Sequence, residues 1–253
     1  MTTFDDIILD DTEDAGRSDA ALADEELETI EIELVVLDMA GTTVKDDGVV
    51  ERAFQLAAER SGITRTEAER ADALAYVRAT MGQSKIDVFR VLADTEEDAV
   101  RANDAFEMAY GEIAAAEGVA AIDGAEDVLR ELREAGVKIA LTTGFSRGTQ
   151  DVLLDALGWN DLVDLTLSPA DAGRGRPFPD LPLTALLRTS VSRVDAVVVV
   201  GDTASDMLSG SAAGAGLVVG VLTGAHDAAT LEEAGADVIL NSIADLPAVL
   251  GLR

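Results

Sequence analysis

The sequence predicts an α/β protein with a doubly wound parallel sheet and an all-helical domain inserted after the first strand. Short apolar runs alternate with helical patterns over most of the chain, which is typical of parallel strands covered by helices. The segment after the first apolar run is instead rich in Ala, Glu and Arg and has no strand-like run. At 253 residues, 48% of them hydrophobic, the chain can bury one sizeable domain and an insert.

The chain divides into three predicted parts. Residues 1–28 are acidic and lack a sustained apolar period, so we expect a disordered tail or a loosely attached extension. Residues 29–47 and 119–253 form the expected core domain. Residues 48–118 form the expected helical domain, because their apolar residues recur at helical spacing.

The individual elements follow from the period of the apolar residues and from the polar residues between them. The predicted strands span residues 32–38, 137–143, 162–167, 196–202, 217–222 and 237–240. The predicted helices include residues 50–60, 98–116, 125–134, 149–157, 182–189 and 206–213. In such sheets ligands bind at the carboxyl ends of the strands, which is where a functional site is expected.

The composition excludes several classes of function. A formal net charge of −30 opposes binding to nucleic acid and to anionic membranes, so the expected partner is a small molecule, and a homodimer is left open. No apolar run approaches the roughly 20 residues that cross a bilayer, and no secretory signal is found, so a cytoplasmic protein is expected. The chain has no cysteine and one histidine, His226, which is expected on the surface. Thiolate metal sites and serine–histidine triads are therefore nearly excluded.

Lysine is almost absent from the chain. Only Lys45, Lys85 and Lys138 occur among 19 Lys and Arg residues, against 49 Asp and Glu residues. This balance indicates a protein from a high-salt cytoplasm, where salt screens the repulsion between carboxylates; the alternative is an ordinary acidic protein. Arginine is the default cation here, and because arginine cannot form an imine, a retained lysine is informative. For Lys85 the alternative is a solvated lysine on a helix.

Three aspartates are placed to meet at the edge of the sheet. Asp38 ends the first strand, Asp202 ends the strand at 196–202, and Asp206 lies one helical turn further on. Together they offer the oxygen ligands that Mg²⁺ prefers. For Asp202 alone the alternative is a helix cap. The joint pattern predicts a metal site.

The motifs DMAGTT, LTTG, GRPFP and GDTASDM resemble those of the haloacid dehalogenase superfamily, over almost the whole chain after the tail. Within it, the Asp-x-Ala-Gly-Thr-Thr form and the arginine in GRPFP are similar to phosphonoacetaldehyde hydrolase and its close relatives. The resemblance implies a Rossmann-like core with residues 48–118 as a mobile cap. The segment Met81-Gly-Gln-Ser-Lys85-Ile-Asp is similar to the cap segment whose lysine forms a Schiff base with the substrate aldehyde.

The resemblance also implies a role for each matching residue. Asp38 would be the nucleophile, and Lys85 would form the imine. The implied Mg²⁺ ligands are Asp38, the carbonyl of Ala40, Asp202 and Asp206. The implied contacts to the phosphoryl group and the substrate are Thr42, Met81, Thr143, Gly144 and Arg176. Two positions differ from the family hydrolase, because Val88 stands where it has a histidine and Phe145 where it has a tyrosine.

The chemistry agrees with this resemblance. Many phosphoryl-transfer enzymes have a second aspartate, which protonates a leaving oxygen, at the position of Ala40. A carbon–phosphorus bond has no such oxygen, and an iminium on Lys85 would accept the electrons instead. The expected function is thus Mg²⁺-dependent hydrolysis of phosphonoacetaldehyde or a related 2-oxoethylphosphonate. Two alternatives are a phosphatase for a small phosphate ester and a non-catalytic protein that binds phosphorylated ligands. The intact Asp38, Asp202 and Arg176 argue against the last.

Overall fold

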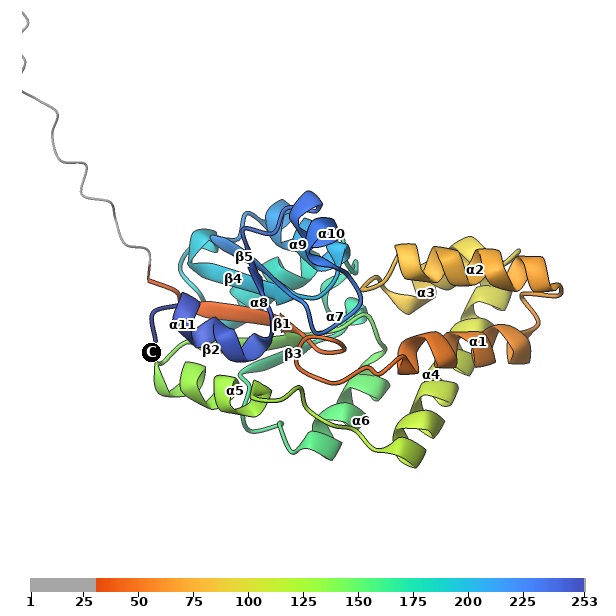
Figure 1. Cartoon of the computed structure of the whole chain (residues 1–253), viewed down its shortest axis with the longest axis horizontal. Helices are drawn as coiled ribbons and strands as arrows, with labels where there is room; N and C mark the ends of the chain where they lie inside the picture. Colours follow the sequence, from red (N-terminus) through yellow and green to blue (C-terminus); the bar gives the residue numbers. More distant parts are fainter. Residues whose placement is uncertain (1–30, 253) are drawn as a thin grey trace, which may run out of the picture.

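The computed structural model describes residues 31–252, and the predicted acidic tail lies outside them. Its centre is a six-stranded sheet with the order β3-β2-β1-β4-β5-β6, in which every neighbouring pair is parallel (Figure 1). The strands are β1 Leu34–Asp38, β2 Lys138–Thr142, β3 Leu165–Leu167, β4 Val197–Gly201, β5 Leu217–Val221 and β6 Val238–Leu240. The predicted doubly wound sheet is confirmed. Its strand order reverses between β1 and β4, and ligands bind at such switch points.

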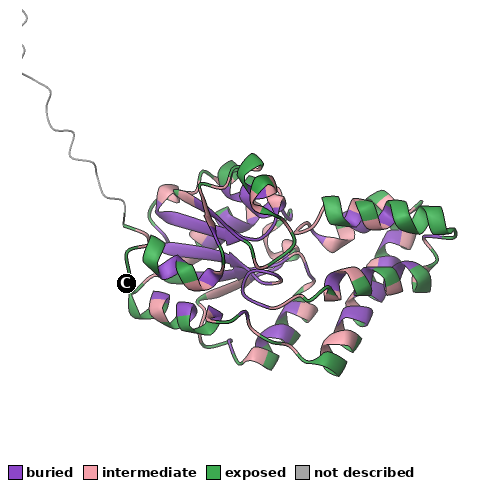
Figure 2. Cartoon of the chain, in the orientation of Figure 1, coloured by how far each residue is buried: buried purple, intermediate pink, exposed green. Residues whose placement is uncertain are grey.

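The central strands are buried on both faces, which explains their continuous apolar sequences. Val35 and Leu37 of β1 belong to one hydrophobic cluster, and Leu34 and Val36 belong to another on the opposite face. This alternation is the period of two expected of a strand. Figure 2 shows the same arrangement, with the buried residues in the sheet and on the inward sides of the helices.

Helices cover both faces of the sheet. On the face of Val35 and Leu37 lie α5 (Ala125–Glu134), α6 (Arg147–Leu157) and α11 (Leu246–Val249). On the other face lie α8 (Asp180–Thr189), α9 (Ala204–Ala213) and α10 (Ala228–Glu233). A short helix, α7 (Pro169–Ala172), follows β3. Within residues 31–252 no helix is both long and apolar enough to span a bilayer.

The segment between β1 and α5 is helical, as the sequence predicts. It contains α1 (Val49–Ser61), α2 (Glu67–Ala79), α3 (Lys85–Leu92) and α4 (Glu96–Glu117), which lie together at one side of the sheet (Figure 1). We call these four helices and their loops the helical insert. The most extensive contact between two helices of the insert is that between α1 and α4, where small residues such as Ala53, Ala57 and Ala102 are fully buried. An aromatic cluster fills the space beside them, with Phe54 stacked on Phe89 at 5.2 Å and Phe89 next to Phe106 at 6.1 Å. The division into a core and a mobile cap stays a prediction.

Candidate active site

A cavity of about 490 Å³ lies where the carboxyl ends of the central strands meet the helical insert. Residues from both parts line it. The predicted site residues on its wall are Asp38, Ala40, Met81, Lys85, Thr143, Gly144, Arg176 and Asp202. The two other predicted residues, Thr42 and Asp206, are buried beside this wall and contact it. Residues far apart in the sequence thus converge on one place.

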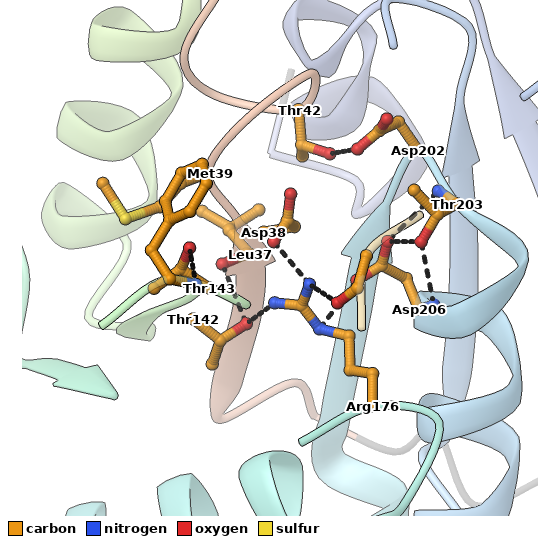
Figure 3. A network of polar contacts seen from close by, with 12 residues as sticks. Leu37, Asp38, Met39, Thr42, Thr142, Thr143, Arg176, Asp202, Thr203 and Asp206 are labelled. Carbon is orange, nitrogen blue, oxygen red and sulfur yellow. Dashed lines mark hydrogen bonds and ion pairs between the residues drawn. The ribbon is translucent and has the colours of Figure 1, made fainter. Parts of the chain in front are cut away.

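Three buried aspartates form the centre of the site (Figure 3). One carboxylate oxygen each from Asp38, Asp202 and Asp206 lies within 4.8 Å of the others. Asp38 is the last residue of β1, Asp202 directly follows β4, and Asp206 is in the first turn of α9. The parallel sheet brings the strand ends together, and the helix start adds the third carboxylate.

Local contacts hold these carboxylates in place. Asp202 accepts hydrogen bonds from the Thr42 hydroxyl at 3.0 Å and from the backbone amide of Ala225 at 2.8 Å. Asp206 accepts from the backbone amide of Thr203 at 3.1 Å, in the capping box that begins α9. Gly41 has a φ of +89°, and a Cβ there would lie 2.5 Å from Asp202 Oδ2, so only glycine fits. Because the Thr42 hydroxyl donates to Asp202, it points toward the carboxylate cluster. A contact between Thr42 and the substrate stays a prediction.

Arg176 is the cation among these aspartates. Its Nη1 lies 2.6 Å from Asp38 Oδ1, and its Nε lies 2.9 Å from Asp206 Oδ1. Nη2 donates to the Thr142 hydroxyl at 2.8 Å, and Nη1 also donates to the carbonyl oxygen of Gly82 at 3.2 Å. Gly82 belongs to the helical insert. The planar guanidinium contacts two carboxylates (Figure 3), and through Gly82 it also joins the strand ends to the insert.

The electrostatics of the cluster indicate a missing positive charge. Burial, together with repulsion from Asp206, raises the pKa of Asp38 to about 7, although the nearby Arg176 acts to lower it. Burial, followed by repulsion from Asp38 and Asp206, raises the pKa of Asp202 well above its usual value. One guanidinium faces three carboxylates, which leaves two negative charges when all are ionised. A divalent cation with oxygen ligands fits this donor set, and Asp38, Asp202, Asp206 and the carbonyl of Ala40 would hold Mg²⁺.

The end of β2 forms the second wall. Thr143 is buried, and its hydroxyl accepts a hydrogen bond from the backbone amide of Phe145 at 3.2 Å. A Cβ on Gly144 would lie 2.4 Å from the carbonyl oxygen of Gln83, so glycine lets the insert approach closely here. The Gly144 carbonyl accepts from the backbone amide of Lys85 at 3.1 Å. This contact fixes the start of α3 against the sheet.

Lys85 is the first residue of α3 and reaches into the cavity. Its Nζ lies 5.5 Å from the centre of the Phe145 ring, and the residue is half-buried. Burial lowers the pKa of Lys85, although Asp38, Asp46 and Glu107 oppose this change. The two other lysines form ion pairs at the surface, Lys45 with Asp123 and Lys138 with Asp164. Within residues 31–252, no carboxylate lies within the ion-pair distance of 4.0 Å from Lys85 Nζ.

Besides the predicted residues, the cavity wall includes His226 and Asp46. His226, expected on the surface, is half-buried and lines the cavity, because the loop after β5 folds over Asp202. Its Nδ1 accepts a hydrogen bond from the backbone amide of Ala204 at 2.8 Å. Asp46 lies in the loop between β1 and α1 and also lines the cavity. Asp46 follows Asp38 by eight residues, but in a chain with 49 Asp and Glu residues this position does not distinguish it as a site residue.

Known proteins share this architecture and sequence. The family of haloacid dehalogenase-like hydrolases matches residues 32–214. Phosphonoacetaldehyde hydrolase from Bacillus mycoides is 32% identical over 225 residues, covering 81% of each chain. The enzyme of that name from Bacteroides fragilis is 32% identical over 263 residues, covering 87% of this chain and 96% of its own. The crystal structure of a phosphonoacetaldehyde hydrolase-like protein from Oleispira antarctica is 27% identical, with a TM-score of 0.74, and covers 87% of this chain and 91% of that one. This chain therefore belongs to the haloacid dehalogenase-like hydrolases.

Proposed function

We propose that this hydrolase cleaves the carbon–phosphorus bond of phosphonoacetaldehyde or a closely related 2-oxoethylphosphonate, with Mg²⁺ as cofactor. One observation carries the proposal. The same cavity contains a nucleophile, Asp38, with Ala40 where a leaving-group acid would stand. It also contains the Lys85 amine, which has no ion-pair partner among residues 31–252. The names of the relatives at about 30% identity support the same substrate class. The net charge of −30 favours a small-molecule substrate over nucleic acid or membranes.

The proposed mechanism divides the work between two residues. Lys85 condenses with the substrate carbonyl and gives an iminium ion with loss of water. Asp38 then attacks phosphorus, the carbon–phosphorus bond breaks, and its electrons move into the iminium to give an enamine. Water cleaves the resulting aspartyl phosphate, and protonation and hydrolysis of the enamine release acetaldehyde and regenerate Lys85. No leaving oxygen needs a proton, which agrees with Ala40.

The other residues of the site would bind and neutralise the phosphoryl group. Bound Mg²⁺ would offset the negative charge of the phosphoryl oxygens beside the carboxylate cluster. The amide of Gly144 and the hydroxyl of Thr143 lie on the cavity wall after β2, where they can hold phosphoryl oxygens. Arg176 contacts Asp38 directly, so it lies next to the atom that attacks phosphorus. Met81 adds an apolar contact from the insert.

A phosphatase for small phosphate esters is the second candidate. The observation in its favour is that Val88 and Phe145 are both buried and apolar, where the similar hydrolase has polar side chains. In that case Lys85 would only attract the phosphate, and a good leaving group would make an acid unnecessary. A non-catalytic role is disfavoured by the complete carboxylate cluster.

Imine trapping tests the proposal. The purified protein is mixed with phosphonoacetaldehyde and borohydride, and the modified residue is located by mass spectrometry. Phosphate release is measured with the same substrate and with p-nitrophenyl phosphate. We expect a reduced adduct on Lys85 and faster turnover of the phosphonate. An unmodified Lys85 together with faster turnover of the aryl phosphate would favour the phosphatase.

A further inference from the structure

The proposed chemistry needs a group that moves protons near Lys85. A lysine ammonium must lose a proton before it attacks a carbonyl, and the carbonyl oxygen must gain two before it leaves as water. The polar side chains that the similar hydrolase has nearby are here Val88 and Phe145, which carry no titratable group. Another residue of the cavity must therefore supply this function.

Most acidic groups near the cavity are already engaged. Asp38 pairs with Arg176, and Asp202 lies in the metal-ligand cluster. Glu51 receives two hydrogen bonds from the Arg78 guanidinium, at 2.7 and 2.8 Å, which lower its pKa and keep it ionised.

Two further groups can be set aside for their position. Glu107 contributes to the field at Lys85, but it accepts hydrogen bonds from Ser146 and Thr149 and does not line the cavity. His226 lines the cavity beside Asp202, whose carbonyl accepts from the His226 amide at 3.2 Å, and so it lies on the metal side.

Asp46 remains. It is half-buried, it lines the same cavity as Lys85, and within the described part of the chain it forms no ion pair. Its Oδ1 accepts a hydrogen bond from the amide of Val50 at 3.1 Å, which fixes the carboxylate at the start of α1. The charges of Asp46 and Lys85 also act on each other, since each shifts the pKa of the other.

We propose that Asp46 is the catalytic acid and base for imine formation on Lys85, an assignment that rests on the proposed function. Because Asp46 and Lys85 Nζ are not in direct contact, the Asp46 carboxylate takes a proton from the Lys85 ammonium through one bridging water. The freed amine forms a bond to the carbonyl carbon while the π electrons move to oxygen. Asp46 returns that proton to the oxygen, giving a hydroxyl group. It then takes a second proton from nitrogen and delivers it to the hydroxyl. Water leaves with the carbon–oxygen bonding electrons, and an iminium remains.

The environment of the two groups favours these transfers. Burial raises the pKa of Asp46, an effect that the amides of Val50 and Gly48 and the charge of Lys85 reduce and that Asp47 increases. Burial lowers the pKa of Lys85, with Arg176 acting in the same direction and Asp38, Asp46 and Glu107 acting against it. The pKa values of Asp46 and Lys85 are therefore closer together than usual. This lowers the energetic cost of moving a proton between the two groups.

Asp46→Asn tests the assignment, because asparagine can still accept from the Val50 amide but does not titrate. Asp46→Ser is the second variant, since the serine hydroxyl is also a hydrogen-bond acceptor but does not titrate. Asp47→Asn is the matched control, because Asp47 is exposed in the same loop and the change removes the same charge. The rate of borohydride trapping with phosphonoacetaldehyde is measured against pH on the full chain with Mg²⁺, and melting temperatures show that each variant is folded.

We expect both Asp46 variants to trap the imine at least about 100-fold more slowly than wild type, and Asp47→Asn to trap it at the wild-type rate. The acid side of the wild-type profile should follow the titration of Asp46, whereas the rate of Asp46→Asn should follow only the loss of the Lys85 proton. Equal trapping rates in wild type and both folded Asp46 variants would overturn this assignment alone. An absence of any adduct in wild type would overturn the proposed function and this assignment together.

Discussion

The sheet and the helical insert contribute to the site in different ways. The sheet and the loops that follow its strands and α7 supply Asp38, Asp202 and Arg176, which are almost completely buried and are fixed by several short polar contacts. The insert supplies Lys85 and Met81, which are half-buried and are placed by a single loop and the start of α3. Under the proposed function, the sheet fixes the chemistry at phosphorus, and the insert determines which leaving group is accepted.

Ring contacts and hydrogen bonds join the two parts, and the Phe145 ring packs against Phe106 and Tyr110 of α4. Besides the Lys85 amide on the Gly144 carbonyl, Arg176 donates to Gly82, and Glu107 of α4 accepts from the start of α6. The ion pairs within the insert, such as Arg60 with Glu112, are exposed and contribute little to stability. Under the proposed function, we expect changes in the sheet to remove all turnover and changes in the insert to alter which substrate is cleaved.

Asp38→Asn should have the largest effect. Asparagine keeps the size of the side chain but removes the nucleophile, so turnover of both a phosphonate and an aryl phosphate should fall by at least about 10⁴-fold. Phosphate release measures this. Activity on either substrate within about tenfold of wild type would mean that Asp38 is not the nucleophile.

The sequence predicts the contribution of the sheet better than that of the insert. Strand ends such as Asp38 and Asp202 are visible because apolar runs stop there, and parallel topology makes them converge. Element boundaries were less accurate. β3 begins at Leu165 and not at residue 162, since Leu162 is held in a turn by the Trp159 carbonyl. α9 begins at Ala204 and not at residue 206, because Thr203 caps it.

Other features depend on tertiary contacts that a local pattern does not contain. Glu107 reaches Ser146, 39 residues away in the sequence, and nothing near either residue predicts that pair. Asp46 is one of 49 acidic residues, and only the cavity distinguishes it from its neighbours. His226 was misplaced because the loop after β5 folds back onto Asp202 through backbone hydrogen bonds, which carry no sequence signal.

Lys85→Arg should separate the two regions. Arginine keeps the positive charge but cannot form an imine, so phosphonate cleavage should fall by about 10³-fold or more. Slow hydrolysis of p-nitrophenyl phosphate by Asp38 should remain within about threefold of wild type. The Lys138→Arg change is the control, since that lysine pairs with Asp164 at the surface. Phosphonate cleavage near the wild-type rate in Lys85→Arg would contradict the imine.

The stability of the metal-free protein should depend on pH through Asp38. Its folded-state pKa is raised to about 7, so between about pH 4 and pH 7 the unfolded chain releases its proton first and the folded state loses stability as the pH rises. The melting temperature in chelator should therefore fall across this window. Saturating Mg²⁺ should reduce the fall, because the cation favours the ionised cluster. Asp38→Asn should show a shallower fall in chelator; an unchanged slope would assign the effect to other carboxylates.

The smallest effect is expected at the contact between α4 and α6. Glu107 accepts from the Ser146 amide at 3.1 Å and hydroxyl at 2.7 Å, and also from the Thr149 hydroxyl, at the amino end of α6. A carboxylate is favourable there because it satisfies free amide donors and the helix dipole. Glu107→Ala should lower the free energy of unfolding by about 1–2 kcal/mol. The matched change Glu112→Ala breaks an exposed pair within the insert and should cost less than about 0.5 kcal/mol.

If the contact between Glu107 and the start of α6 also holds the insert against the sheet, Glu107→Ala should lower phosphonate turnover several-fold and leave aryl phosphate hydrolysis unchanged. Equal losses on both substrates would show that the contact stabilises the fold without positioning Lys85.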